Sequence, residues 1–209
     1  MSDRFKPSII DVAIMVDAPR IMFDYGPNKA QDRKTFSDFF NLGKGVGYVY
    51  MAATWWDSQN EGDSELDVFG VKGNTIRWRM QTLSMGGRAD ASLDSAAAPV
   101  AFQAVIRGFV FQGTQWSEFI TKPTRKVETV KTWGFDADGN VVRQNITDVY
   151  WESQVITPGP VTYHTPFNIF CDSPNCSDGS DGSDDSGGGG GNGCGGYQHD
   201  PYINVNLNQ

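Results

Sequence analysis

Apolar and polar residues alternate with a period of two along most of the chain, which is the pattern of half-buried β-strands. In the first such segment, every second residue from Ile10 to Val16 is aliphatic. In residues 75–83 the alternation sorts five side chains onto two faces, with Ile76, Trp78 and Met80 on one and Arg77 and Arg79 on the other. We therefore predict a strand in each segment, with Trp78 in the core and the two arginines outside it.

Further segments of this kind follow at short intervals. They are residues 47–56, 66–71, 99–112, 116–121, 126–135, 141–145, 149–156, 161–170 and 202–207. The first of these is rich in Tyr, Val and Trp, which favours a central strand. Lys72-Gly73-Asn74 predicts a hairpin-type turn, and residues 136–140 predict another.

From these segments we expect about nine or ten short strands, with no convincing helix of ten residues and no repeat of 20–50 residues. Such spacing is typical of an all-β sandwich. We predict one jelly-roll-like β-sandwich domain over residues 1–209. A low-complexity segment interrupts it: residues 177–196 contain 10 Gly, 4 Ser and 4 Asp. This composition predicts a flexible loop over residues 172–196, inserted before the last strand.

Composition bounds the class of protein. The chain has 209 residues, of which 39% are hydrophobic, so it can bury a sizeable core. No run of 18 apolar residues and no signal peptide is evident, so we expect no membrane insertion and a cytoplasmic location, with signal-less secretion as the alternative.

The charges are unevenly divided. All 17 Lys and Arg lie in residues 1–143, whereas residues 144–209 carry 8 of the 25 acidic residues and no Lys or Arg. No basic patch is indicated, so nucleic acid is not an expected partner. The ordinary explanation of an acidic balance is solubility.

The three cysteines, Cys171, Cys176 and Cys194, are confined to the last quarter of the chain. Their odd number does not suit a disulfide framework, and their spacing does not suit a zinc ribbon. We expect free thiols, with a local disulfide as the alternative in an oxidising compartment.

Residue patterns that carry catalysis are missing. The chain has no G-x-S-x-G elbow, no H-E-x-x-H and no Walker lysine followed by Ser or Thr, and His164 and His199 are its only histidines. The Ser-Asp-Gly repeats and Asp136–Asn140 lack the EF-hand spacing, so a turn explains the latter better than calcium does. We expect no enzyme, no cofactor and no metal site.

The chain does contain aromatic and arginine side chains of the kind that bind carbohydrates. An exposed Trp stacks on the C–H face of a sugar, while charged groups hold its hydroxyls. The candidate site residues are Trp55, Trp56, Asp57, Arg77, Arg79 and Trp116. A single shallow site binds weakly, so we expect a homo-oligomer, most simply a dimer, to supply avidity. The alternative is that the Trp side chains are core and the arginines merely solvated.

An ordered set of motifs resembles the PixA/AidA inclusion-body proteins. Residues 73–79, Gly-Asn-Thr-Ile-Arg-Trp-Arg, are similar to the family's central signature, and the segments at 11–17, 48–51, 150–152, 159–164 and 196–205 resemble other family motifs in order. The chain departs from the pattern at Asn74 and His199, in the 172–196 insertion and over residues 101–145, as a distant member would. The resemblance implies a compact β-sandwich that accumulates in the cytoplasm, with no catalytic residues to carry over.

Two functions are open at this point. The first is a lectin-like protein that binds glycans or glycoconjugates, stored in the cytoplasm and with a defensive role. The alternative is an inclusion-body storage or self-assembling structural protein without a glycan ligand.

Overall fold

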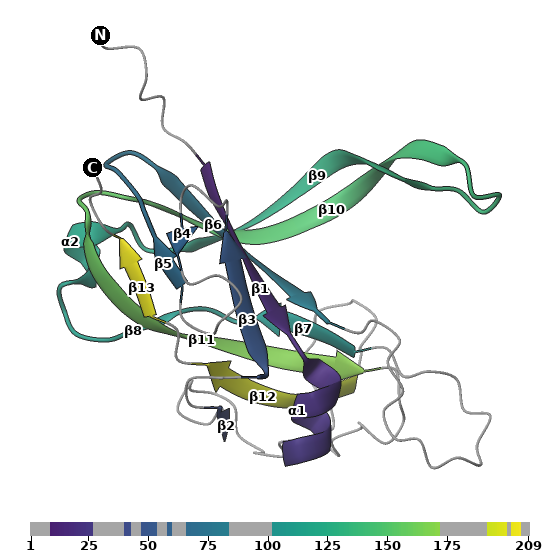
Figure 1. Cartoon of the computed structure of the whole chain (residues 1–209), viewed down its shortest axis with the longest axis horizontal. Helices are drawn as coiled ribbons and strands as arrows, with labels where there is room; N and C mark the ends of the chain where they lie inside the picture. The colour runs from purple at the N-terminus through teal and green to yellow at the C-terminus, as the bar shows by residue number, and fades with distance from the viewer. Residues whose placement is uncertain are drawn as a thin grey trace, which may run out of the picture.

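Two β-sheets pack on either side of one hydrophobic cluster, which confirms the all-β class (Figure 1). The computed structural model describes residues 9–26, 40–42, 47–53, 58–59, 66–83, 102–171, 192–199 and 202–205. Within these ranges, no helix has the length and apolar character needed to cross a bilayer.

The first sheet has five strands in the order β3-β1-β6-β10-β9. Their bounds are β1 (Ile9–Val16), β3 (Val49–Ala53), β6 (Thr75–Thr82), β9 (Thr124–Phe135) and β10 (Val141–Gln154). β1 pairs antiparallel with β3 and parallel with β6. β3 lies at an edge, so the predicted central position of residues 47–56 is wrong for the part described. Tyr- and Val-rich sequence fits a pleated surface at an edge as well as at the centre.

The second sheet is organised by β11 (Gly159–Cys171), a long strand with partners along both halves. Its C-terminal half pairs with β12 (Asn192–His199) and β7 (Phe102–Ile106), and its N-terminal half with β13 (Tyr202–Val205) and β8 (Val110–Phe111). The sheet is completed by β2 (Phe40–Asn41), β4 (Ser58–Gln59) and β5 (Leu66–Val68).

The turn at Lys72–Asn74 is present, but the hairpin predicted around it is wrong. The Asn74 side chain accepts a hydrogen bond from the Val71 N–H at 2.8 Å, and Gly73 has φ +90°, which favours glycine. The turn, however, leads from β5 in one sheet to β6 in the other. Alternation in the sequence tells which face of a strand is buried but not which sheet it joins.

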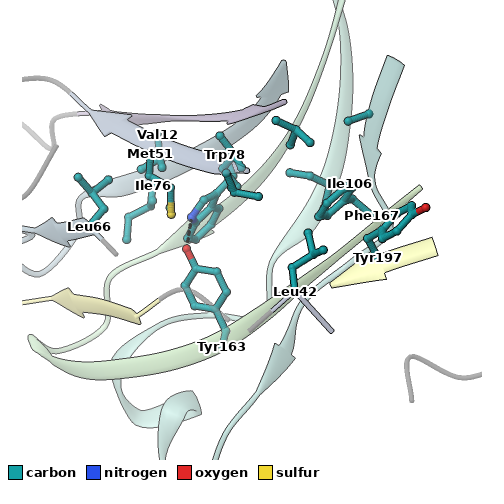
Figure 2. Packing of buried hydrophobic residues seen from close by; sticks show 14 of the residues in the cluster. Val12, Leu42, Met51, Leu66, Ile76, Trp78, Ile106, Tyr163, Phe167 and Tyr197 are labelled. Carbon is teal, nitrogen blue, oxygen red and sulfur yellow. Dashed lines mark hydrogen bonds between the residues drawn. The ribbon is translucent and has the colours of Figure 1, made fainter. Parts of the chain in front are cut away.

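The core forms where the buried faces of the two sheets meet. The predicted inward faces of β1 and β6 are confirmed, since Ile10, Val12, Ile14, Val16, Ile76 and Trp78 are all buried. The Trp78 indole N–H donates a hydrogen bond across the core to the Tyr163 hydroxyl of β11 at 3.0 Å (Figure 2). Burial of the phenol raises the pKa of Tyr163 far above its usual value. This bond satisfies a polar group in an apolar surrounding and links the sheets.

Two short helices were not predicted. α1 (Ala18–Tyr25) begins after Asp17, whose carboxylate accepts a hydrogen bond from the Arg20 N–H, and carries a proline in its first turn. α2 (Trp116–Phe119) replaces the strand expected over residues 116–121. At eight and four residues, both are too short to give a clear helical period.

The C-terminal region differs from expectation in two respects. β12 begins at Asn192, so the last five residues of the predicted 172–196 loop belong to a strand, and residues 172–191 lie outside the described ranges. The register of β12 against β11 shifts between Ile169 and Phe170 and accommodates Cys194 as an extra residue. Cys171 is disulfide-bonded, which overturns the expectation of a free thiol there.

Candidate functional site

The arginine pair predicted from the sequence lies on the outer face of the five-stranded sheet. Arg77 stands opposite Glu152 of β10 in the register, and its Nε donates a hydrogen bond to the Glu152 carboxylate at 2.9 Å. Both side chains are about three-quarters buried. The guanidinium is therefore already paired within the sheet.

Arg79 is held by two carboxylates from neighbouring strands. Its Nε and Nη2 donate to Asp148 of β10 in a forked arrangement, with Nη2 at 2.8 Å, and its Nη1 donates to Asp11 of β1. The hydrogen bonds that Arg79 donates to Asp148, foremost, and to Asp11 raise the pKa of Arg79 above its usual value. The guanidinium thereby links three adjacent strands, β1, β6 and β10.

Tyr150 fills the space beneath the two arginines. The guanidinium carbons of Arg77 and Arg79 lie 4.7 and 4.8 Å from the centre of its ring, within range of cation–π attraction. The phenol is buried, and this burial, with the nearby Glu128 carboxylate, raises its pKa. The outer face of this sheet thus carries a network of paired charges above one aromatic ring. These charged side chains cover the ring and bury it.

Trp116 lies elsewhere. Its ring stacks on Phe111 with the ring centres 4.1 Å apart, and it packs against the edge of the core. Trp116 and Trp151 line one cavity. Trp151 lies on the core-facing side of β10, which is opposite to the face that holds Arg77 and Arg79. The structure therefore does not bring Trp116 together with the arginine pair. Trp55, Trp56 and Asp57 lie outside the described residues, so the carbohydrate site as a whole stays a prediction.

The strands and the turn of one hairpin were predicted from the sequence, but its projection from the body of the protein was not. β9 and β10 pair along twelve successive positions, but only Trp151–Gln154 of β10 also pair with β6. The rest forms a two-stranded ribbon that extends away from both sheets (Figure 1). We call residues 127–149 the arm.

One face of the arm carries five exposed apolar side chains in two groups. The register places Val127 opposite Val149 at the root and Phe135 opposite Val141 at the tip, where Trp133 is opposite Arg143 on the same face. The polar pairs between the two groups are Thr129–Thr147 and Lys131–Asn145. Trp133 is 64% exposed and Phe135 72%. This face continues the side on which the half-buried Trp151 of β10 packs against the core, but along the arm no second layer of the described chain covers it, and only the Arg143 guanidinium lies over Trp133, 4.9 Å from its ring centre. We call these five side chains the apolar arm face.

The arm ends in an ordered, acidic turn. Asp136 accepts hydrogen bonds from the backbone N–H groups of Asp138 and Asn140 and from the Asn140 side chain, at 2.8–3.1 Å. These bonds, from Asn140 above all, lower the pKa of Asp136. Gly139, at φ +82°, supplies the left-handed position. The predicted turn at 136–140 is confirmed, and it fixes two carboxylates at the tip of the arm.

Two cavities lie at the root of the arm, on the side of its apolar face. The larger, of about 300 Å³, is lined by Gly108, Phe109, Phe111, Trp116, Pro123 and Trp151, with Arg107 and Lys122 at its rim. The smaller, of about 230 Å³, shares Trp151 and is bordered by Val149 and Arg125. The walls of the larger cavity are mainly aromatic and those of the smaller one mainly aliphatic, and the charged residues that line them are cationic. Among the described residues, no group of three or more His, Cys, Asp or Glu side chains could hold a metal ion.

Comparison with known proteins identifies a family and a similar solved structure. A family model described as PixA, inclusion body protein, matches residues 8–205. The crystal structure of an inclusion body protein from Burkholderia cenocepacia is similar over 99% of this chain and 100% of that one, with a TM-score of 0.64 and 13% sequence identity, which shows a shared fold. No curated protein matches the sequence significantly.

Proposed function

Because the chain belongs to the PixA inclusion body protein family, we propose that it is a self-assembling protein that accumulates in the cytoplasm as packed inclusions. Its role in this proposal is structural or storage, and no catalytic step is assigned to any residue. The family description and the fold shared with the Burkholderia protein support this class of function over the carbohydrate hypothesis.

The observation that carries the proposal is the apolar arm face. A monomeric soluble protein rarely leaves a contiguous apolar surface of more than a few hundred Å² uncovered. Here two aromatic and three aliphatic exposed side chains share one face of a ribbon that projects from the body, with the aromatic ones grouped at its tip and polar residues between the tip and the root. In addition, β9 is the last strand of its sheet among the described residues, and within them its outer backbone edge has no partner strand and can pair with another chain. Both features favour association with further copies.

The outer-face network supports the same conclusion. A sugar site would need guanidinium donors that are free to reach a ligand. Arg77 and Arg79 instead direct donors to Glu152, Asp148 and Asp11 within the chain. We therefore rank glycan recognition at these arginines below self-assembly as a candidate function.

Sedimentation velocity over a wide range of protein concentration, together with a glycan array, tests the proposal. We expect a blank array and a weight-average sedimentation coefficient that rises with concentration. A protein that stays monomeric at every concentration would contradict self-assembly. Retention on a glycan, competed away by a monosaccharide and lost in Arg77→Ala, would instead support the lectin hypothesis.

A further inference from the structure

The two ends of the arm are complementary to each other. The tip presents Trp133 and Phe135 beside the exposed acidic residues Asp136 and Asp138. The root presents cavities with aromatic and aliphatic walls beside the exposed cations Arg107, Lys122 and Arg125. Apolar surface therefore matches apolar surface, and the carboxylates of the turn match the cations of the rim, while the one cation beside the tip aromatics, Arg143, is engaged with the Trp133 ring.

We propose that the tip of the arm of one copy docks into the cavities at the root of the arm of a second copy. This inference rests on the proposed function and specifies its contact: Trp133 and Phe135 enter the space lined by Phe111, Trp116 and Trp151. The acidic turn then meets the cationic rim. The occupant of the cavities is a second molecule of this chain.

The tip cannot reach the root of its own arm. Phe135 and Val127 are separated by eight residues along β9, about 26 Å at ~3.3 Å per residue. The ribbon is paired without interruption over this length, so folding it back would break its hydrogen bonds. The apolar arm face and the root cavities lie on the same side of the ribbon, so a second arm can stack on it face to face, at the ~10 Å spacing of packed sheets.

The surface available is sufficient for a stable contact. A covered Trp or Phe buries about 150–250 Å². A reciprocal contact would cover four such side chains and the six valines of the two arms. With the matching cavity walls, this reaches the range of about 1,200–2,000 Å² that specific interfaces bury.

The tip and the root are different patches of one molecule, and this has a consequence for assembly. If two copies exchange tips reciprocally, the contact closes as a dimer with two-fold symmetry. If each copy gives its tip to a new neighbour, the same contact propagates as an open chain. The second arrangement leads directly to packed material of unlimited size.

Two variants and their mixture test the proposal. The tip variant combines Trp133→Ser with Phe135→Ser, and the root variant combines Lys122→Glu with Arg125→Glu. All four positions are exposed or rim positions, so both variants should keep the thermal midpoint of the wild type. Ile146→Ser, on the opposite face of the arm, is the matched control and should associate as the wild type does.

We expect the tip variant to associate at least about thirtyfold more weakly, as loss of central aromatic anchors does, and the root variant at least about tenfold. A 1:1 mixture should form a heterodimer, because each variant supplies the patch that the other lacks. Association of the tip variant at wild-type strength would overturn the inference while leaving self-assembly intact. Loss in both variants without recovery in the mixture would also overturn it, because a tip-to-root contact needs only one intact tip and one intact root, and the mixture supplies both. A wild type that never associates would contradict the proposed function itself.

Discussion

Trp78→Ala is expected to lower the free energy of unfolding by about 3–5 kcal/mol, the cost of removing a large buried aromatic side chain. Trp78 is 1% exposed, its ring lies 5.0 Å from that of Phe109, and its indole N–H is bonded to the Tyr163 hydroxyl. Truncation therefore leaves both a cavity between the sheets and a buried hydroxyl without its donor (Figure 2).

Urea unfolding followed by circular dichroism measures this change. Trp133→Ala is the matched control, because the same side chain is removed from a position that is 64% exposed, and its stability should stay within about 0.5 kcal/mol of the wild type. If Trp78→Ala were as stable as the control, the assignment of Trp78 to the interface of the two sheets would be wrong.

Gly159→Ala is expected to destabilise the fold by about 1–3 kcal/mol, the usual cost of overpacking. Gly159 does not have a positive φ, so alanine would ordinarily stabilise this position slightly. A methyl group here, however, would overlap the ring of Phe119. The Phe119 carbonyl accepts hydrogen bonds from the N–H groups of Ile156 at 2.7 Å and Thr157 at 3.2 Å, which prevents α2 from moving away.

A double-mutant cycle identifies the cause. In the Phe119→Ala background the overlap is removed, so Gly159→Ala should there be neutral or stabilising. The same cost in both backgrounds would show that glycine is needed for another reason.

Local regularity made part of the fold predictable. The alternation at Ile10–Val16 and at Ile76–Met80 identified the buried faces correctly, because one face of each strand packs against the core, fully at Ile10–Val16 and at Ile76 and Trp78, and partly at Met80. Sheet membership was not predictable, because Leu66 and Val68 of β5 alternate with polar residues just as those of β6 do, yet the two strands join different sheets. α1 left only an Asp-x-Pro start signal and one helical turn of buried residues.

The candidate site was harder to predict, for a physical reason. Val127, Trp133 and Phe135 have the same period and composition as a strand that is half buried, and the sequence contains no sign that their partner sheet ends before them. Arg77 and Arg79 were placed on the correct face, but their partners Asp11, Asp148 and Glu152 come from distant parts of the chain. Only the register of three strands brings these groups together.

The arm carries the self-association surface that we propose, and it contributes little to the stability of the fold. Thr129 and Thr147 are paired in the register, so residues 130–146 can be replaced by an Asn-Gly turn that closes the shortened hairpin. The part removed contacts mainly itself and solvent, so the thermal midpoint should remain within a few degrees of the wild type.

Sedimentation velocity of the shortened protein beside the wild type, at matched concentrations, is the most direct measurement. The account predicts a folded monomer at concentrations where the wild type associates. Assembly of the shortened protein at the concentration required by the wild type would contradict it, because the self-association surface would then lie outside the arm.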